Sequence, residues 1–164
     1  MSPLDPAPAS RLAAALASGP AALFAELSAL FTAVPGVRAA TFIAVAPDRT
    51  VSHRIGTSNP IDFPVGNVDP VGDDPWNRRI LGERRPVIGN DVAGMAAFIP
   101  ETGGLVAMGY GACSCFPIVI AGETRGVVAL LGDAGIFTSA ALAQIDALLP
   151  IAALIFTFEG ISER

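Results

Sequence analysis

The chain has 164 residues, which is enough for one domain with a full hydrophobic core. Hydrophobic residues make up 52% of it and charged residues 15%, and the formal net charge is −5. An acidic chain whose ten basic residues are all arginine is a poor nucleic-acid binder, because neutralising phosphates supplies most of that affinity. We therefore expect no nucleic-acid partner.

The termini and the cysteines indicate the compartment. The start, MSPLDPAPAS, has an aspartate and no basic residue, unlike a signal peptide. The most apolar late segment, 147–158, is about 12 residues long, short of the ~20 that span a bilayer. The only cysteines, Cys113 and Cys115, form no disulfide framework. We expect a cytoplasmic protein without a membrane partner.

The N-terminal part is expected to be helical after a short lead. Residues 1–9 contain three prolines and are predicted to be a flexible lead, and residues 10–164 a single domain. Ser10 is a suitable N-cap for a helix ending near Ala17. Pro20 begins a second, amphipathic helix. Its apolar residues fall on one face: Leu23, Leu27, Leu30 and Phe31.

The middle of the chain begins with a hairpin. Residues 38–46 and 49–56 read as two strands with a short antiparallel connection. The proline-rich segment 57–74 follows, and loops of this length inside a domain are usually functional. Short elements come next: a helix over 76–83, an edge strand over 86–89 and a helix over 91–100.

The last third contains the most regular pattern. Residues 111–120 and 125–132 are apolar strands joined by a turn in which Gly122 can adopt positive φ. Thr138 or Ser139 caps a long final helix. The order is therefore helix, hairpin, long excursion, hairpin, helix. It predicts an α+β fold: a central antiparallel sheet with the terminal helices on one face. Loops and short helices should cover a ligand cavity on the other face.

These residues resemble a known family. The segment CFPIVIAGETRGVVALLGDAGIFTSAALAQIDALLPIAALI resembles the C-terminal half of a GAF domain, with Pro117-Ile118, Gly122, 126–130 and Phe137 at the matching places. DPWNRRILGERRPVIGND is similar to that family's middle helix. The resemblance spans roughly residues 20–160. It implies a GAF-like fold and a sensory or regulatory domain that binds a small molecule.

Members of this family differ in the ligands that they bind and the reactions that they catalyse. Its cyclic-nucleotide binders use an Asn-Lys-x-Phe-Asp-Glu motif, and this chain has no lysine. Its bilin binders attach the pigment at a cysteine followed by a histidine, and neither cysteine of this chain is followed by a histidine. It also includes free methionine-R-sulfoxide reductases, with cysteines around the pocket. The alternative is thus a thiol-dependent reductase of a small oxidised metabolite, with Cys113 and Cys115 as catalytic candidates. A third possibility is a ligand-free dimeric interaction scaffold.

The strand before the long loop contains the first candidate ligand residues. His53 alternates with Val51 and Ile55, so the three face the same way, and His53 can contact a ligand if that face lines the cavity. A structural histidine is the alternative. Ser58 and Asn59 begin the loop at the expected pocket mouth, where they bind ligand or only support turns.

Further candidates lie between the two hairpins. Trp76, the sole tryptophan, is a core plug or a ligand lid. Asn90 and Asp91 cap a helix or contact ligand. Arg79 belongs to a cluster that either pairs with nearby carboxylates or holds a small anionic metabolite. The cluster consists of Arg78, Arg79, Arg84 and Arg85.

Cys113 and Cys115 lie two apart on one strand and so face the same side, with Cα atoms about 6.5–7 Å apart. They are either cavity wall, with Cys113 touching ligand, or redox-active. Two thiols and the distant His53 are an incomplete metal set, so no metal and no cofactor is expected. The final helix is apolar on more than one side. We therefore expect a homodimer through the terminal helices, and an effector protein as a possible partner.

Overall fold

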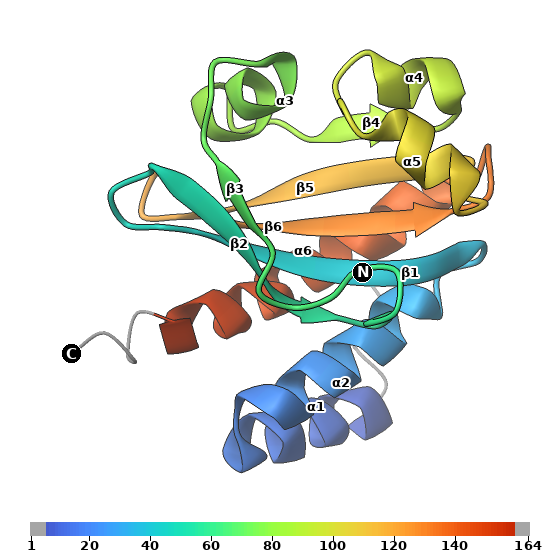
Figure 1. The fold of residues 1–164 in the computed structure, drawn as a ribbon. Coiled ribbons are helices and arrows are strands. Elements are labelled where there is room, and N and C mark those ends of the chain that lie inside the picture. Colours follow the sequence, from blue (N-terminus) through green and yellow to red (C-terminus); the bar gives the residue numbers. More distant parts are fainter. Residues whose placement is uncertain (1–5, 160–164) are drawn as a thin grey trace.

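The computed structural model describes residues 6–159 and shows one antiparallel sheet with helices on both faces (Figure 1). The strand order is β3-β2-β1-β6-β5-β4. The strands are β1 (Val37–Val45), β2 (Val51–Thr57), β3 (Val68–Pro70), β4 (Val87–Gly89), β5 (Ala112–Ile120) and β6 (Glu123–Gly132). The predicted α+β class is confirmed.

The helices divide into long terminal ones and short internal ones. The terminal helices α1 (Pro6–Ser18), α2 (Pro20–Thr32) and α6 (Ser139–Glu159) cover one face of the sheet (Figure 1). The internal ones are α3 (Pro75–Asn77), the wide turn η1 (Arg78–Gly82), α4 (Val92–Ala96) and α5 (Thr102–Ala107). They lie over the opposite face, as the sequence predicts.

The β5–β6 hairpin closes through a two-residue turn. Ala121 has φ 51° and Gly122 has φ 81°, and two consecutive positive φ values match the twist of antiparallel strands. The prediction of positive φ at Gly122 is confirmed. β6 then pairs with β1 along its length, so the first and last strands of the chain are the central pair of the sheet.

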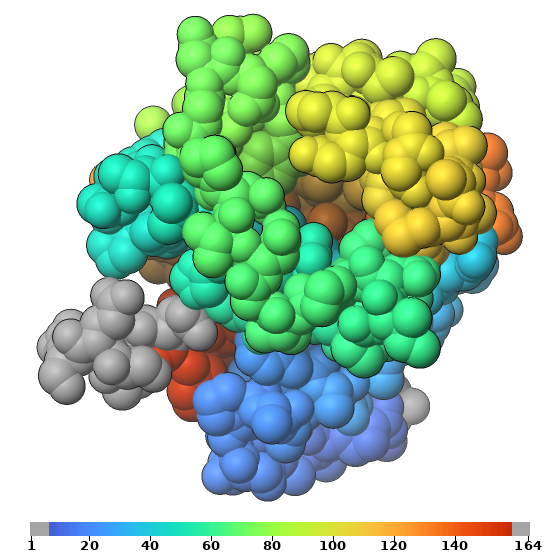
Figure 2. Space-filling model, viewed as in Figure 1, coloured from blue at the N-terminus to red at the C-terminus, as the bar shows by residue number. Residues whose placement is uncertain are grey.

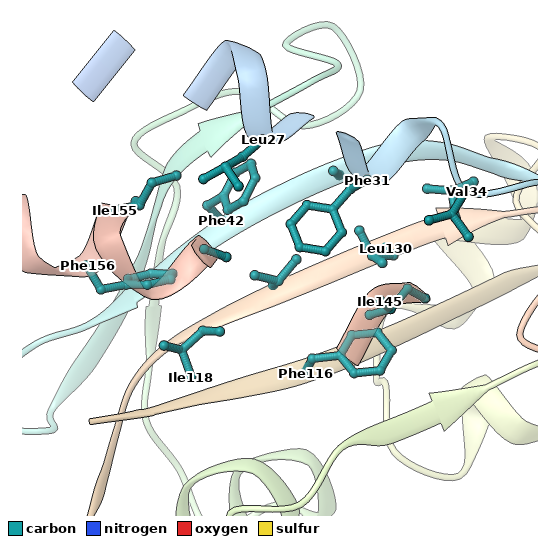
Figure 3. Close-up of a cluster of buried hydrophobic side chains, with 14 of the residues drawn as sticks. Leu27, Phe31, Val34, Phe42, Phe116, Ile118, Leu130, Ile145, Ile155 and Phe156 are labelled. Carbon is teal, nitrogen blue, oxygen red and sulfur yellow. The ribbon is translucent and has the colours of Figure 1, made fainter. Parts of the chain in front are cut away.

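The main core lies between the sheet and the terminal helices (Figure 3). Phe42 from β1 and Leu130 from β6 point toward α2 and α6, where Phe31 and Ile145 are fully buried. Successive side chains on a strand alternate between faces, so Ala129 and Leu131 belong to a second core beneath the short helices. Burial on both faces explains why β6 reads as a continuous apolar run.

Several boundaries differ from the predictions. α1 begins at Pro6, so Ser10 lies inside the helix and does not cap it. Prolines are tolerated there because first-turn N–H groups have no helical partner. Of the predicted lead, residues 1–5 lie outside the described residues. β3 and α5 were not predicted: β3 has only three residues, and α5 begins with Thr102 followed by two glycines, which favour helix weakly.

α6 is longer than its apolar segment suggests. Thr138 caps it, since its Oγ1 accepts a hydrogen bond from Ala141 N at 3.2 Å. The helix has 21 residues and continues through Pro150, so the long final helix is confirmed, and it extends well beyond the apolar segment 147–158. By length and composition, Ser139–Phe158 could cross a membrane, with a mean hydropathy of 1.9. One such helix is weak evidence, because core helices of soluble proteins pass the same test.

Candidate functional site

A cavity of about 560 Å³ lies on the sheet face opposite the terminal helices. Figure 2 shows the molecule hollowed between the green segment that includes α3 and the yellow segment that includes α4 and α5, with orange atoms of the sheet at the bottom. Its volume falls in the range of small-molecule sites. We call the residues of the central strands β1, β5 and β6 that line it the floor: Thr41, Ile43, Cys113, Cys115, Ala129 and Leu131.

The walls come from segments far apart in the sequence. Phe63 and Pro64 belong to the long loop, Trp76 to α3, and Leu105 and Met108 to α5 and its C-cap. Phe63 is buried against Tyr110, with ring centroids 5.5 Å apart. The interior is therefore mostly apolar and aromatic, as expected of a site that holds an organic molecule.

A polar network fixes the loop side of the cavity. Asn59 Nδ2 donates to Asp62 Oδ2 at 2.8 Å and to the Tyr110 hydroxyl at 3.2 Å. The same hydroxyl donates to Asp62 Oδ2 at 3.0 Å. Burial raises the pKa of Tyr110, and the hydrogen bond to Asp62 raises it further. Asp62 lines the cavity, so this network holds a carboxylate at its edge.

Arg54 is the arginine among the lining residues. Its guanidinium lies 5.5 Å from the centroid of the Phe63 ring, and Nη1 donates to Pro64 O at 3.1 Å. Its Nε is buried without a hydrogen-bond partner. Burial lowers the pKa of Arg54, and the Asp69 carboxylate opposes that shift. Arg54 is thus already used to hold the loop against β2.

The two cysteines form a hydrogen-bonded thiol pair in the floor. Both are free and buried. The pKa of Cys113 is raised well above its usual value, first by its hydrogen bond to Cys115 and then by burial. The same hydrogen bond lowers the pKa of Cys115 against the opposing effect of burial, and a hydrogen bond from Trp76 acts in the same direction. Cys115 is therefore the better thiolate of the pair.

Of the residues predicted to bind ligand, Trp76 and Cys113 line the cavity, and Cys115 lies beside them. Asn59 is not among the lining residues, but it donates a hydrogen bond to Asp62, which is. Ser58 ties the start of the long loop to β1, because its Oγ accepts a hydrogen bond from Ala40 N at 2.8 Å. The structure therefore brings together the tryptophan, the thiols and the beginning of the loop.

The remaining predicted residues lie elsewhere. His53 pairs with Ala44 on the helix side of the sheet, while Ser52 and Arg54 line the cavity. Asp91 caps α4 by accepting from Gly94 N at 2.7 Å. Asn90 Oδ1 accepts from Phe137 N at 2.9 Å, which ties the segment before α6 to the sheet edge.

Arg79 and its neighbours do not line the cavity. Arg79 pairs with Glu83 at 3.0 Å and donates to Pro86 O, and Arg78 pairs with Asp73 at 2.8 Å. These contacts match the alternative of an arginine cluster paired with nearby carboxylates. The sequence reasoning missed Arg54 and Glu101, although alternation with His53 could have identified Arg54.

No known family model matches the sequence, and no curated protein matches it significantly. The fold matches solved structures. The GAF domain of an Acinetobacter phosphoenolpyruvate-protein phosphotransferase superposes with a TM-score of 0.71 at 12% identity, covering 100% of both chains. The GAF domain of a two-component sensor histidine kinase from Bacillus halodurans gives 0.69 at 12% identity, over 85% of this chain and 95% of that one.

A third match is fRMsr of Staphylococcus aureus, solved in complex with its substrate. Its TM-score is 0.58 at 14% identity, over 82% of this chain and 84% of that one. At such identities the comparisons concern the fold. The chain has the GAF-domain fold, as the sequence resemblance implies.

Proposed function

We propose that this chain is a sensory domain that binds a small molecule in the cavity between the sheet and the long loop. The single observation that supports this most is the cavity itself, about 560 Å³ with an apolar floor and a few placed polar groups. Similar folds in a sensor kinase and a phosphotransferase agree with a regulatory role. A scaffold whose side chains fill its own interior would have no such space.

The sheet offers a short route from ligand to output. Ala129 and Leu131 face the cavity, while Val128 and Leu130, between and beside them on β6, face the helices. A ligand that moves the floor therefore moves residues that α2 and α6 pack against. Only 28% of the apolar stretch of α6 is buried. We propose that its remaining surface contacts a second copy of the chain or an effector protein; the cytoplasmic location stays a prediction.

Filling the cavity is expected to remove binding. In the wild type, a ligand at about a hundredfold excess over Kd should raise Tm by about 5–10 °C. It should also change the emission of Trp76, the sole tryptophan and a cavity residue. Ala129→Leu extends a floor side chain into the space, so both responses should disappear. The measurement is a thermal-shift screen of a metabolite library, followed by fluorescence titration.

The matched control is Ala143→Leu, the same change at an exposed position of α6. It should respond to the ligand like the wild type. The proposal is contradicted if no compound stabilises the wild type, or if Ala129→Leu still responds to a compound that does.

The thiol pair favours a second candidate function, reduction of a small sulfoxide. In this reaction Cys115 attacks the sulfoxide sulfur, Cys113 completes a disulfide, and the substrate oxygen leaves as water, so two thiols are oxidised and the sulfoxide becomes a sulfide. An external dithiol must then reduce the disulfide. The pair lies in the floor, the pKa of Cys115 is lowered by its partner, and one similar fold is fRMsr.

For this candidate, Cys115→Ser and Cys113→Ser are each expected to abolish turnover of free methionine sulfoxide with a dithiol reductant. Ser114→Ala serves as the folding control. In the wild type, Ser114 Oγ accepts a hydrogen bond from Gly89 N. The reductase function is excluded if the wild type reduces no sulfoxide, or if both cysteine variants keep its rate.

A further inference from the structure

The cavity has an excess of negative charge. Its charged lining residues are four carboxylates and one guanidinium, and the guanidinium of Arg54 lies within the electrostatic reach of Asp69. The carboxylates are Asp62, Asp69, Asp74 and Glu101. An anionic ligand would enter among four carboxylates and meet one guanidinium, that of Arg54, which already lies over the Phe63 ring and donates to Pro64 O. The excess of like charge opposes its binding.

The four carboxylates differ in their hydrogen-bond partners. Asp62 accepts from Asn59 and Tyr110, and Asp74 caps α3 and bonds Asn77. Asp69 accepts from Asn67 at 2.8 Å. Within the described part of the chain, Glu101 has no such partner: it occupies the N-cap position of α5 without a capping bond from its side chain. It lines the cavity from an exposed position, and its charge raises the pKa of both floor cysteines.

The aromatic walls suit a cation. Trp76 is the best side chain for cation–π contact, and it lies in the same cavity as Glu101. Phe63, another aromatic residue of the wall, already has the guanidinium of Arg54 over its ring. The described residues contain no group of three or more histidine, cysteine or acidic side chains that could hold a metal ion. These features favour an organic cation over an inorganic one.

We propose that the occupant is a small organic amine whose apolar body packs on the floor and whose ammonium group lies between Glu101 and Trp76. This inference rests on the proposed binding function and adds the chemical class of the ligand. It replaces the anionic metabolite suggested by the arginine cluster, which lies outside the cavity and of which Arg78 and Arg79 pair with carboxylates.

The test compares three probes of similar shape and different charge: phenethylamine, hydrocinnamate and phenethyl alcohol. Each is titrated against the wild type while Trp76 emission is followed. Phenethylamine is expected to bind at least about tenfold more tightly than hydrocinnamate, and its affinity should fall as salt is added. Glu101→Lys should weaken phenethylamine by about fivefold or more and bring the affinity for hydrocinnamate up, because the charge at the mouth is reversed.

The matched control is Asp146→Lys, which makes the same kind of charge change at an exposed position of α6, on the other side of the sheet. It should leave the ratio of amine to carboxylate affinity within about twofold of the wild type, since distant exposed charges are screened. Glu101 is exposed, so its replacement leaves the core intact.

Three results overturn the inference: hydrocinnamate or the alcohol binding as tightly as the amine, an unchanged affinity ratio in Glu101→Lys, or no binding of any probe. The binding function is judged separately. If a neutral or anionic compound binds the wild type and not Ala129→Leu, the cavity is a ligand site and only its proposed charge preference fails.

Discussion

Phe42→Ala is expected to lower the free energy of unfolding by about 3–5 kcal/mol. Phe42 is fully buried in the middle of β1, and its ring centroid lies 5.5 Å from that of Phe24 and 6.2 Å from that of Phe31. Removing the ring loses its burial and leaves a space between α2 and the sheet. The rigid pairing of β1 with both β2 and β6 limits collapse into that space.

Chemical denaturation at equilibrium measures this loss. Phe42→Leu should cost clearly less, because a branched aliphatic side chain fills most of the volume. Ile61→Ala is the surface control: Ile61 is 91% exposed, so its change should stay within about 0.5 kcal/mol. A Phe42→Ala variant as stable as this control would mean that the β1–α2 contact contributes little to the fold.

The sequence predicted the strand pairs because both hairpins are local. The β5–β6 turn needs positive φ at Gly122, and the strands beside it are apolar throughout, so pattern and turn chemistry agree. The β1–β6 pairing is not local: the order of elements predicted one central sheet but did not say which strands of the two hairpins lie side by side. Composition alone could not order them.

The site was harder to predict because a two-sided sheet gives no clear polar face. Strand alternation correctly separates His53 from Ser52 and Arg54, but it does not say which set faces the ligand. Glu101 lies before a six-residue helix that was not predicted, so nothing placed its charge near the thiols. For the arginine cluster the sequence left two interpretations open, and the salt bridges of Arg78 with Asp73 and of Arg79 with Glu83 match the pairing with nearby carboxylates.

Gly132→Ala is expected to lower the free energy of unfolding by about 2–3 kcal/mol. Gly132 ends β6, and a Cβ there would lie 2.1 Å from the carbonyl oxygen of Gly36. That atom belongs to the backbone of a turn with φ 85°, which leads directly into β1. The turn cannot retreat without disturbing the pairing of Val37 with Gly132 itself.

Gly104→Ala provides the contrast. A Cβ at this exposed position of α5 meets no atom within 4 Å, so alanine should raise stability by about 0.5–1 kcal/mol through lower backbone entropy in the unfolded chain. Both variants add one methyl group, and opposite signs in denaturant titration would show that close approach at Gly132, rather than loss of glycine, is responsible. Equal stability of Gly132→Ala and the wild type would mean that the turn at Gly36 shifts freely and that β1 and β6 are less tightly fixed than their pairing implies.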